Sequence, residues 1–391
     1  MTVRSPARAA VMGTASLVVG ALLLVPAAPA VATAEPRPPK PMAADSPLLD
    51  REGTQVRPRR GAPELPGGVS ALSWLVADAD TGEVLAARDA HRQLPPASTL
   101  KALFALTALP NVPGELRHRV TEEELAGVGD GSSLVGIIPG RTYRAADLWR
   151  GVFLSSGNDA VHVLAEMNGG WKHTAARMTA KAKELGARNT RVVSPDGYDA
   201  PGQVSSAYDL AVFGRAGLRE EEFVEYSGTA VAKFPGDGWS YDIQNTNRLL
   251  TGADGVGTYP GIIGVKNGYT SRAGHTLIAA ARREDRTLVV SVMNPQAGGG
   301  RAVYAEARAL LDWGFAAAGR VSPVGSLEPP PAPAPKAGPE AAARSAAARE
   351  EEKGGSGGVW PAVGALAGVL CVAAAVAVPL WRARRGAFGR G

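Results

Sequence analysis

The sequence predicts an α/β protein in which an antiparallel sheet is flanked by helices and a helical segment is inserted in the middle of the chain. Apolar stretches of strand length occur in two groups, one around residue 75 and one after residue 260. Between them, apolar residues recur at steps of three and four, which is typical of amphipathic helices. We therefore expect the early strands to pair with the late ones in a single sheet, with helices packed around it.

The first strand group is predicted to be a hairpin, because apolar residues at 72–78 and 83–86 are separated by the turn sequence Ala-Asp-Thr-Gly. The predicted late strands are residues 262–266, 276–281 and 287–293. The predicted helices are residues 101–109, 145–153, 160–167, 174–185, 206–217 and 302–315. Together these elements define one domain, residues 68–320.

The two ends of the 391-residue chain do not belong to this domain. Residues 1–34 contain two arginines, an apolar run and Ala-Thr-Ala, in the order of a secretory signal peptide. Residues 359–381 carry no charge and are long enough to cross a bilayer, and the arginines of residues 382–391 favour a cytoplasmic tail. We therefore expect an exported domain that is anchored in the cell membrane by a C-terminal transmembrane helix.

Two segments of linker composition frame the domain. Residues 35–67 are rich in Pro, Arg and acidic residues, and residues 321–358 contain a Pro/Ala run, an Ala/Glu stretch and a Gly/Ser stretch. Such compositions are typical of unstructured or semi-rigid linkers. The second linker would hold the domain away from the membrane surface.

The charge and the cysteine count exclude several functions. The formal net charge of +5 becomes −1 once the two arginines of the signal segment and the four of the tail are set aside, so nothing indicates nucleic-acid binding. The only cysteine, Cys371, lies in the predicted span, which leaves the domain without a disulfide or a thiol nucleophile. The five histidines have no metal-ligand spacing, and we expect neither a metal nor a cofactor.

Ser98 and Lys101 are the first candidate catalytic pair, in the sequence Ser-Thr-Leu-Lys. A serine hydroxyl is a weak nucleophile until a neighbouring group accepts its proton. Lys101 can do so if burial lowers its pKa, and the apolar helix that follows would supply that desolvation. Ser98 would lie in the first helical turn, where the helix dipole stabilises an incipient alkoxide. Alone, the pair is also consistent with an N-cap serine and a lysine that extends to solvent.

Two further motifs change this interpretation. Ser156-Gly157-Asn158 lies between two predicted helices, and Lys266-Asn267-Gly268-Tyr269-Thr270 follows a short apolar strand. In this order, the three motifs resemble the Ser-x-x-Lys, Ser-x-Asn and Lys-Thr-Gly signature of the penicillin-binding proteins and serine β-lactamases. The sequence around these motifs, over residues 68–317, is similar to that of the serine D-Ala-D-Ala carboxypeptidases, which are low-molecular-mass penicillin-binding proteins. The matching segments are PASTLK at 96–101, SSGNDA at 155–160, SPDGYD at 194–199 and GVKNGYT at 264–270.

The resemblance implies a β-lactamase/transpeptidase-like fold and removal of the terminal D-Ala from peptidoglycan stem peptides, with β-lactams as covalent inhibitors. Ser98 would form the acyl-enzyme, Lys101 would accept its proton, and Ser156 would relay a proton to the leaving amine. Asn158 would hydrogen-bond Lys101 or the substrate amide.

On the strand side, the resemblance makes Lys266 the positive charge that binds the substrate carboxylate and helps to keep Lys101 unprotonated. The backbone N–H groups of Ser98 and Tyr269 would form the oxyanion hole.

One position departs from the family pattern. The family usually has threonine where Asn267 stands, and that hydroxyl is expected to contact the substrate carboxylate. Because an asparagine amide can donate a similar hydrogen bond, we expect altered affinity rather than lost activity. Thr270 is a second candidate for this contact, and Arg301, just before the last helix, is a weaker one.

Three alternatives remain open on the sequence. A D,D-endopeptidase also cleaves after D-Ala, so the motifs do not separate it from a carboxypeptidase. A class A β-lactamase shares the motifs but needs a loop glutamate that activates the deacylating water, whereas Glu166 lies in the helix predicted after Ser-Gly-Asn. A catalytically silent wall-binding protein has no physical need for all of the motif residues.

Overall fold

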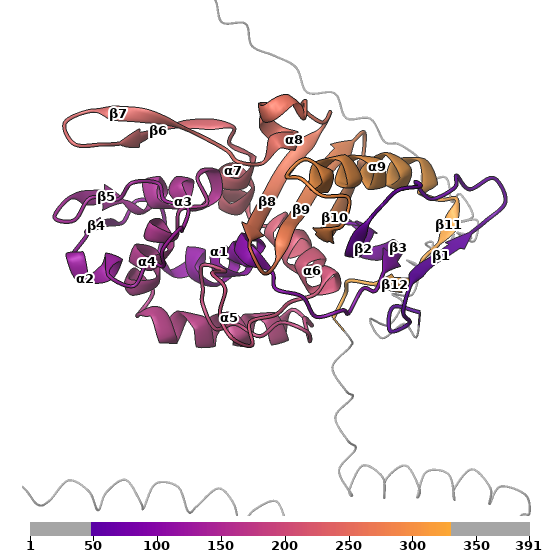
Figure 1. The fold of residues 1–391 in the computed structure, drawn as a ribbon, viewed down its shortest axis with the longest axis horizontal. Coiled ribbons are helices and arrows are strands. Elements are labelled where there is room, and N and C mark those ends of the chain that lie inside the picture. Colours follow the sequence, from indigo (N-terminus) through magenta and orange to yellow (C-terminus); the bar gives the residue numbers. More distant parts are fainter. Residues whose placement is uncertain (1–47, 330–391) are drawn as a thin grey trace, which may run out of the picture. The chain divides into compact units, whose positions relative to one another are not determined.

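Residues 48–329 are described by the computed structural model; the predicted signal peptide, transmembrane helix and cytoplasmic tail lie outside the described residues. Within residues 48–329, no helix combines the length and the apolar composition that a membrane span needs. The strands of the main sheet are β1 Thr54–Pro58, β2 Ala71–Asp78, β3 Glu83–Arg88, β8 Ile262–Thr270, β9 Gly274–Arg283, β10 Arg286–Pro295, β11 Val321–Ser322 and β12 Gly325–Ser326. Their order is β11-β1-β3-β2-β10-β9-β8, and β12 pairs with β3 (Figure 1).

The early hairpin pairs with the late strands, as the sequence predicted. Strands β2 and β10 are antiparallel neighbours, with Val76 opposite Val290. Both strands are apolar along nearly their whole length because helices cover both faces of the sheet. Along β2, Leu75 and Ala77 enter the core on one face, whereas Trp74 and Val76 enter the core on the other.

Helices form a layer on each face of the sheet. Helix α9 (Ala302–Ala317) packs on β2, β9 and β10 from one side, and α6 (Ala207–Gly217) packs on the same strands from the other side (Figure 1). Helix α1 (Lys101–Ala108) packs against α6 and connects this layer to the helical insertion. The predicted helices at these three places are confirmed.

The helical insertion lies beyond the β8 edge of the sheet. It contains helices where the sequence predicted them (α3, α4 and α5), together with two small two-stranded sheets, β4-β5 and β6-β7, that were not predicted. The remaining elements are α2 Glu122–Leu125, α3 Ala145–Leu154, α4 Asn158–Met167, α5 Trp171–Glu184, α7 Glu221–Gly228, α8 Arg248–Thr251, β4 Arg117–Arg119, β5 Thr142–Arg144, β6 Val231–Pro235, β7 Ser240–Gln244, and the 3-10 helices η1 Ala97–Leu100, η2 Leu109–Asn111 and η3 Ala253–Gly255.

The domain is longer at both ends than the sequence predicted. Strand β1 lies in the expected linker 35–67, and strands β11 and β12 lie in the expected linker 321–358, so these parts of the linker prediction are wrong. The three strands are short and contain Arg, Pro and Gly, so they have no apolar alternation of their own. They are strands because they pair with neighbours in the sheet, which intrinsic propensity does not report. Residues 35–47 and 330–358 lie outside the described residues.

Candidate active site

The three motifs of the sequence meet at the β8 edge of the main sheet. Ser98 lies in the 3-10 helix η1, which runs directly into α1, and not in the first turn of an α-helix as the sequence predicted. Thr276 of strand β9 donates a hydrogen bond to the backbone oxygen of Pro96 at 2.9 Å, which fixes η1 against the sheet. Ala97, directly before Ser98, has a left-handed backbone with φ +50°. Such strain persists only where the surroundings enforce it, and it occurs frequently at active sites.

Lys101 is fully buried, and its amine is surrounded by three oxygen atoms. Nζ lies 2.9 Å from Ser98 Oγ, 2.6 Å from Asn158 Oδ1 and 2.6 Å from the backbone oxygen of Asp196. Burial lowers the pKa of Lys101 to about 8, against the opposing effect of the Asp196 and Asp159 carboxylates. The predicted pairing of the serine with a desolvated lysine is therefore present in the structure.

The partners of Lys101 also orient its lone pair. A neutral amine has two hydrogens and one lone pair, and neither the amide oxygen of Asn158 nor the backbone oxygen of Asp196 can donate. The two hydrogens must go to these two oxygens if both are to be satisfied. The lone pair then points at Ser98 Oγ, which is the direction that proton removal requires.

Ser156 and Asn158 are held by the loop between α3 and α4. Ser156 is buried with a left-handed φ of +56°, and Asn158 begins α4. Asn158 donates a hydrogen bond from Nδ2 to Ser132 Oγ at 2.9 Å while its Oδ1 accepts from Lys101. Asn158 therefore binds Lys101, which is one of the two contacts that the sequence analysis left open.

The buried carboxylate of Asp159 shapes the wall next to Asn158. It accepts hydrogen bonds from the backbone N–H groups of Val135, Gly136 and Ile137 at 3.0, 2.8 and 2.9 Å. Since a carboxylate accepts several backbone N–H bonds well, Asp159 fixes the loop that carries Ser132 to the start of α4. The segment SSGNDA thus supplies this structural anchor in addition to the motif residues.

Lys266 lies on the edge strand β8, as the sequence predicted, and its side chain is 1% exposed. Its amine donates a hydrogen bond to the backbone oxygen of Asn267 at 2.9 Å. Burial and the nearby Lys101 lower the pKa of Lys266 well below its ordinary value. These surroundings disfavour the positive charge on Lys266 that the sequence analysis expected for binding the substrate carboxylate.

Gly268 brings strand β8 into direct contact with the backbone of Ser98. A Cβ atom at this position would lie 2.7 Å from Ser98 N and 3.0 Å from Thr99 N, so only glycine allows the approach. Tyr269, the next residue on the strand, is 61% exposed, and its ring lies 4.6 Å from that of His275. The backbone segments expected to form the oxyanion hole are thus neighbours.

Asn267 and Thr270 have different surroundings. Asn267 Oδ1 accepts a hydrogen bond from Thr246 Oγ1 at 2.9 Å, which leaves the amide nitrogen of Asn267 to donate to a ligand. The Thr270 hydroxyl donates to Asp199 Oδ1 at 2.8 Å and accepts from the backbone N–H of Ala273 at 3.0 Å. The hydroxyl proton of Thr270 is therefore already used within the protein, so Thr270 is the weaker candidate for a carboxylate contact.

Two further candidates lie outside this cluster. Arg301 is exposed at the N-terminal end of α9, and a Cβ atom added at Gly255 of η3 would lie 3.9 Å from its Nη1. Glu166 lies near the end of α4, where it accepts a hydrogen bond from the backbone N–H of Trp171 at 3.3 Å. In the part of the chain that the structure describes, neither residue forms a hydrogen bond or an ion pair with Ser98 or Lys101, so neither is assigned a catalytic role.

The sequence analysis missed the groups that hold the motif residues in place. The backbone oxygen of Asp196, the hydroxyls of Ser132 and Thr246, and the carboxylate of Asp199 each bind a motif residue. The SPDGYD segment indicated that Asp196 and Asp199 lie near the site. The role of the Asp196 backbone oxygen could not be predicted, because every residue type has such an oxygen. Ser132 and Thr246 lie in segments without any motif.

Gly197 positions the Asp196 carbonyl, and a Gly197→Ala variant is expected to lose about 10- to 100-fold in the rate of acylation. The residue has φ +82°, and an added Cβ would lie 2.1 Å from the backbone oxygen of Ala97, directly before Ser98. The matched control is Gly202→Ala, which has φ +80° but meets only the flexible end of Arg191 at 3.3 Å. Stopped-flow acylation by a penicillin, together with thermal melts, separates the two variants. Equal losses in both would show that backbone strain, and not displacement of Ser98, is responsible.

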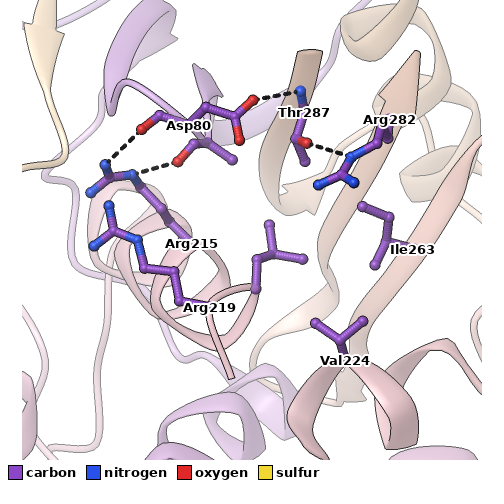
Figure 2. Close-up of a pocket in the computed structure, with 9 residues that line it drawn as sticks. Asp80, Arg215, Arg219, Val224, Ile263, Arg282 and Thr287 are labelled. Atoms are coloured by element: carbon purple, nitrogen blue, oxygen red, sulfur yellow. Dashed lines mark hydrogen bonds between the residues drawn. The ribbon is translucent and has the colours of Figure 1, made fainter. Parts of the chain in front are cut away.

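The cavity in Figure 2 lies at the other end of β9 and β10 from the motif cluster. It measures about 430 Å³, and none of the predicted site residues lines it. Its arginines are countered by acidic groups and backbone oxygens: Arg215 donates to Ala79 O at 2.8 Å and to Glu328 at 2.5 Å. Within residues 48–329, no three His, Cys, Asp or Glu side chains are arranged to hold a metal ion.

The fold and the cluster define a serine acyl-transfer enzyme. A partly buried hydroxyl bound to a desolvated lysine has the arrangement of an activated nucleophile, and the sheet with its helical insertion has the fold of the penicillin-binding proteins and transpeptidases. The chain belongs to the D-alanyl-D-alanine carboxypeptidase family, whose sequence profile matches residues 60–297. It is therefore a serine-type carboxypeptidase hydrolase.

Known relatives agree with this assignment. The chain is 42% identical over 275 residues to D-alanyl-D-alanine carboxypeptidase DacB2 of Mycobacterium tuberculosis, covering 70% of this chain and 90% of that protein. It is 35% identical over 264 residues to DacD of Escherichia coli, covering 64% of each. A crystal structure of a D-alanyl-D-alanine carboxypeptidase from Mycobacterium tuberculosis matches with a TM-score of 0.63 at 39% identity, covering 70% of this chain and all of that chain.

Proposed function

We propose that this chain removes the terminal D-Ala from peptidoglycan stem peptides through an acyl-enzyme on Ser98. The observation that carries the proposal is the 2.9 Å contact between Ser98 Oγ and the buried amine of Lys101. A lysine whose pKa is lowered to about 8 can accept a proton near neutral pH.

In the acylation step, the Ser98 proton moves to Lys101 Nζ as Oγ attacks the carbonyl carbon of the penultimate D-Ala. The negative charge that develops on the carbonyl oxygen is stabilised by the backbone N–H groups of Ser98 and Tyr269. The C–N bond to the terminal D-Ala then breaks as Ser156 passes its hydroxyl proton to the leaving amine and receives in exchange the proton that Lys101 accepted from Ser98. Water hydrolyses the resulting ester and restores Ser98.

Substrate binding is expected to favour the charged form of Lys266. Burial and Lys101 lower the pKa of Lys266, whereas a substrate carboxylate nearby favours the charged amine. Charging Lys266 in turn favours the neutral form of Lys101, because like charges repel. The terminal carboxylate of the substrate would thus help to prepare the base that attacks its own peptide bond.

Two readouts on the purified protein test the proposal. A peptide that ends in D-Ala-D-Ala should release free D-Ala, and a fluorescent penicillin should label the protein on the tryptic peptide that contains Ser98. Label without D-Ala release would contradict carboxypeptidase activity. Release of larger fragments from crosslinked muropeptides, with no free D-Ala, would instead support a D,D-endopeptidase.

The amide of Asn267 is expected to bind the substrate carboxylate in place of the usual threonine hydroxyl. Thr246 donates to Asn267 Oδ1, so the amide nitrogen is free to donate to the carboxylate. An Asn267→Ala variant should therefore lose about 10- to 100-fold in kcat/KM, as expected for a hydrogen bond to a charged group. An Asn267→Thr variant should stay within about 10-fold of the wild type, since it keeps a donor. Steady-state kinetics on a soluble peptide measure both, and an unchanged alanine variant would assign the carboxylate to another residue.

The location that fits this activity is outside the cell membrane. The order of features in residues 1–34 supports export, and the uncharged residues 359–381 followed by arginines support a single C-terminal span. The catalytic domain would then act on the cell wall while it remains tethered. Protease accessibility of the domain in intact cells, with and without membrane disruption, tests this topology.

A further inference from the structure

Four exposed arginines gather at the edge of the sheet that lies farthest from β8. Arg57 in β1 is paired with Ser322 in β11, and Arg59 binds the same serine from Nε at 3.0 Å. The backbone N–H of Arg59 donates to the backbone oxygen of Arg320 at 2.9 Å. Arg60 follows directly in the sequence. We call Arg57, Arg59, Arg60 and Arg320 the basic edge.

The charges of the basic edge have no acidic partner in the part of the chain that the structure describes. Elsewhere in the domain, arginines such as Arg248 and Arg283 form ion pairs with carboxylates at 2.8 and 2.7 Å. No carboxylate of residues 48–329 lies within 4.0 Å of the four guanidinium groups. The exposed Glu52 and Glu64, which belong to the same part of the sequence, also form no ion pair with them.

Protection of an edge strand does not by itself explain this cluster. Charged residues and proline on an edge strand prevent the pairing of two sheets, and Arg57 and Pro58 on β1 suit that role. Arg60 and Arg320, however, lie outside β1 and β11. All four arginines are exposed at or directly beside the β1 and β11 pair, and a group of guanidinium groups suits a partner with many phosphate groups.

We infer that the basic edge docks the domain on the anionic headgroups of the membrane to which the chain is tethered. Each Arg near an anionic bilayer adds to the electrostatic attraction, within about one Debye length of the surface. The domain cannot move far from the bilayer, because residues 330–358, which link it to the proposed span, could reach at most about 100 Å even if fully extended. Such a tether supplies a high effective concentration, so a weak electrostatic contact suffices.

Docking by this edge orients the active site. The strand order places β11 at one end of the sheet and β8, with Lys266, at the other (Figure 1). Six strand spacings separate these ends, which corresponds to about 29 Å along the sheet. A domain docked by its basic edge therefore presents the Ser98 cluster away from the bilayer, toward the wall. This inference rests on the exported, membrane-tethered location proposed above.

Vesicle co-sedimentation tests the docking without the tether. Residues 48–329 belong to one compact unit with its own hydrophobic cores, so this segment can be produced alone. It should bind vesicles that contain phosphatidylglycerol, should not bind phosphatidylcholine vesicles, and should dissociate at high salt. Replacing all four arginines with glutamine (Arg57→Gln, Arg59→Gln, Arg60→Gln and Arg320→Gln) should weaken binding by at least about 100-fold. Both proteins should release D-Ala from a soluble peptide at the same rate.

A matched control separates the basic edge from net charge. It carries Arg117→Gln, Arg119→Gln, Arg144→Gln and Lys172→Gln, which are exposed positions elsewhere on the domain. This control should keep its vesicle binding, and an equal loss would overturn the inference. The inference would also be overturned if the wild-type domain did not bind the vesicles. The same holds if the basic-edge variant aggregated but still bound vesicles as strongly as the wild type, or if it lost binding to isolated cell walls and not to vesicles. If the wild-type domain released no D-Ala, the proposed function would be contradicted, regardless of the result of the vesicle-binding experiment.

Discussion

A Ser98→Ala variant is expected to lose about 10⁶-fold in kcat, the scale seen when the nucleophile of a serine hydrolase is removed. The hydroxyl of Ser98 lies on the lone-pair side of Lys101 Nζ, at 2.9 Å, where it can donate its proton. Alanine leaves no atom that can form the acyl-enzyme, and its smaller side chain should not disturb η1. Fluorescent penicillin labelling and D-Ala release measure the loss, with circular dichroism to confirm that the variant is folded.

The control for this experiment is Ser322→Ala, which removes a hydroxyl at the far edge of the sheet. This variant should be labelled and active like the wild type. If Ser98→Ala is labelled as strongly as the control, Ser98 is not the nucleophile. In that case the peptide that carries the label identifies the residue that is.

A Lys101→Met variant is expected to acylate about 10²- to 10⁴-fold more slowly, which is the usual contribution of a general base. Methionine has a similar length and suits the fully buried site. It removes a buried amine that is costly to desolvate, so the variant should remain folded. Stopped-flow acylation by a penicillin measures the rate. A variant that retains full activity would show that another group accepts the Ser98 proton.

The same residue sets the expected pH dependence. Lys101 can accept a proton only when it is neutral, so kcat/KM of the wild type should rise as the pH increases through about 8. Below this pH the amine is charged and activity should fall about tenfold per pH unit. The residual activity of Lys101→Met should lack this rising limb. A wild-type profile that falls between pH 7 and 9 would contradict a neutral lysine base.

The long helices and strands with a clear apolar pattern could be predicted from the sequence. The short strands, which form only by pairing with neighbours in the sheet, could not. The β2–β3 hairpin, the three late strands and α9 have apolar patterns that extend over many residues, so their positions were predicted closely. Strand β11 has two residues, and β1 contains Arg and Pro. Their conformation depends on hydrogen bonds to a sheet that assembles from distant segments, which no local pattern records.

In the candidate site, the side chains that carry the chemistry could be predicted from the sequence, but the backbone groups that hold them could not. Ser98, Lys101, Asn158 and Lys266 could be named because their chemistry resides in their side chains. The structure places them together, but it also shows that the Asp196 backbone oxygen completes the surroundings of Lys101. It further shows that burial and the nearby Lys101 lower the pKa of Lys266. The charge state of a buried lysine depends on burial and on its neighbours, which are properties of the folded protein only.

The position of β8 at the end of the sheet has a consequence for which peptide bond is cut. Among residues 48–329 the strand pairs with β9 alone, so an extended peptide could add to its other side as a further strand. Shifting such a strand by one residue turns every side chain to the opposite face. A terminal carboxylate held near Asn267 would fix the register, so that the last peptide bond, and not the one before it, lies opposite Ser98. The register of the substrate strand along β8 would then determine which product forms, before any bond is broken.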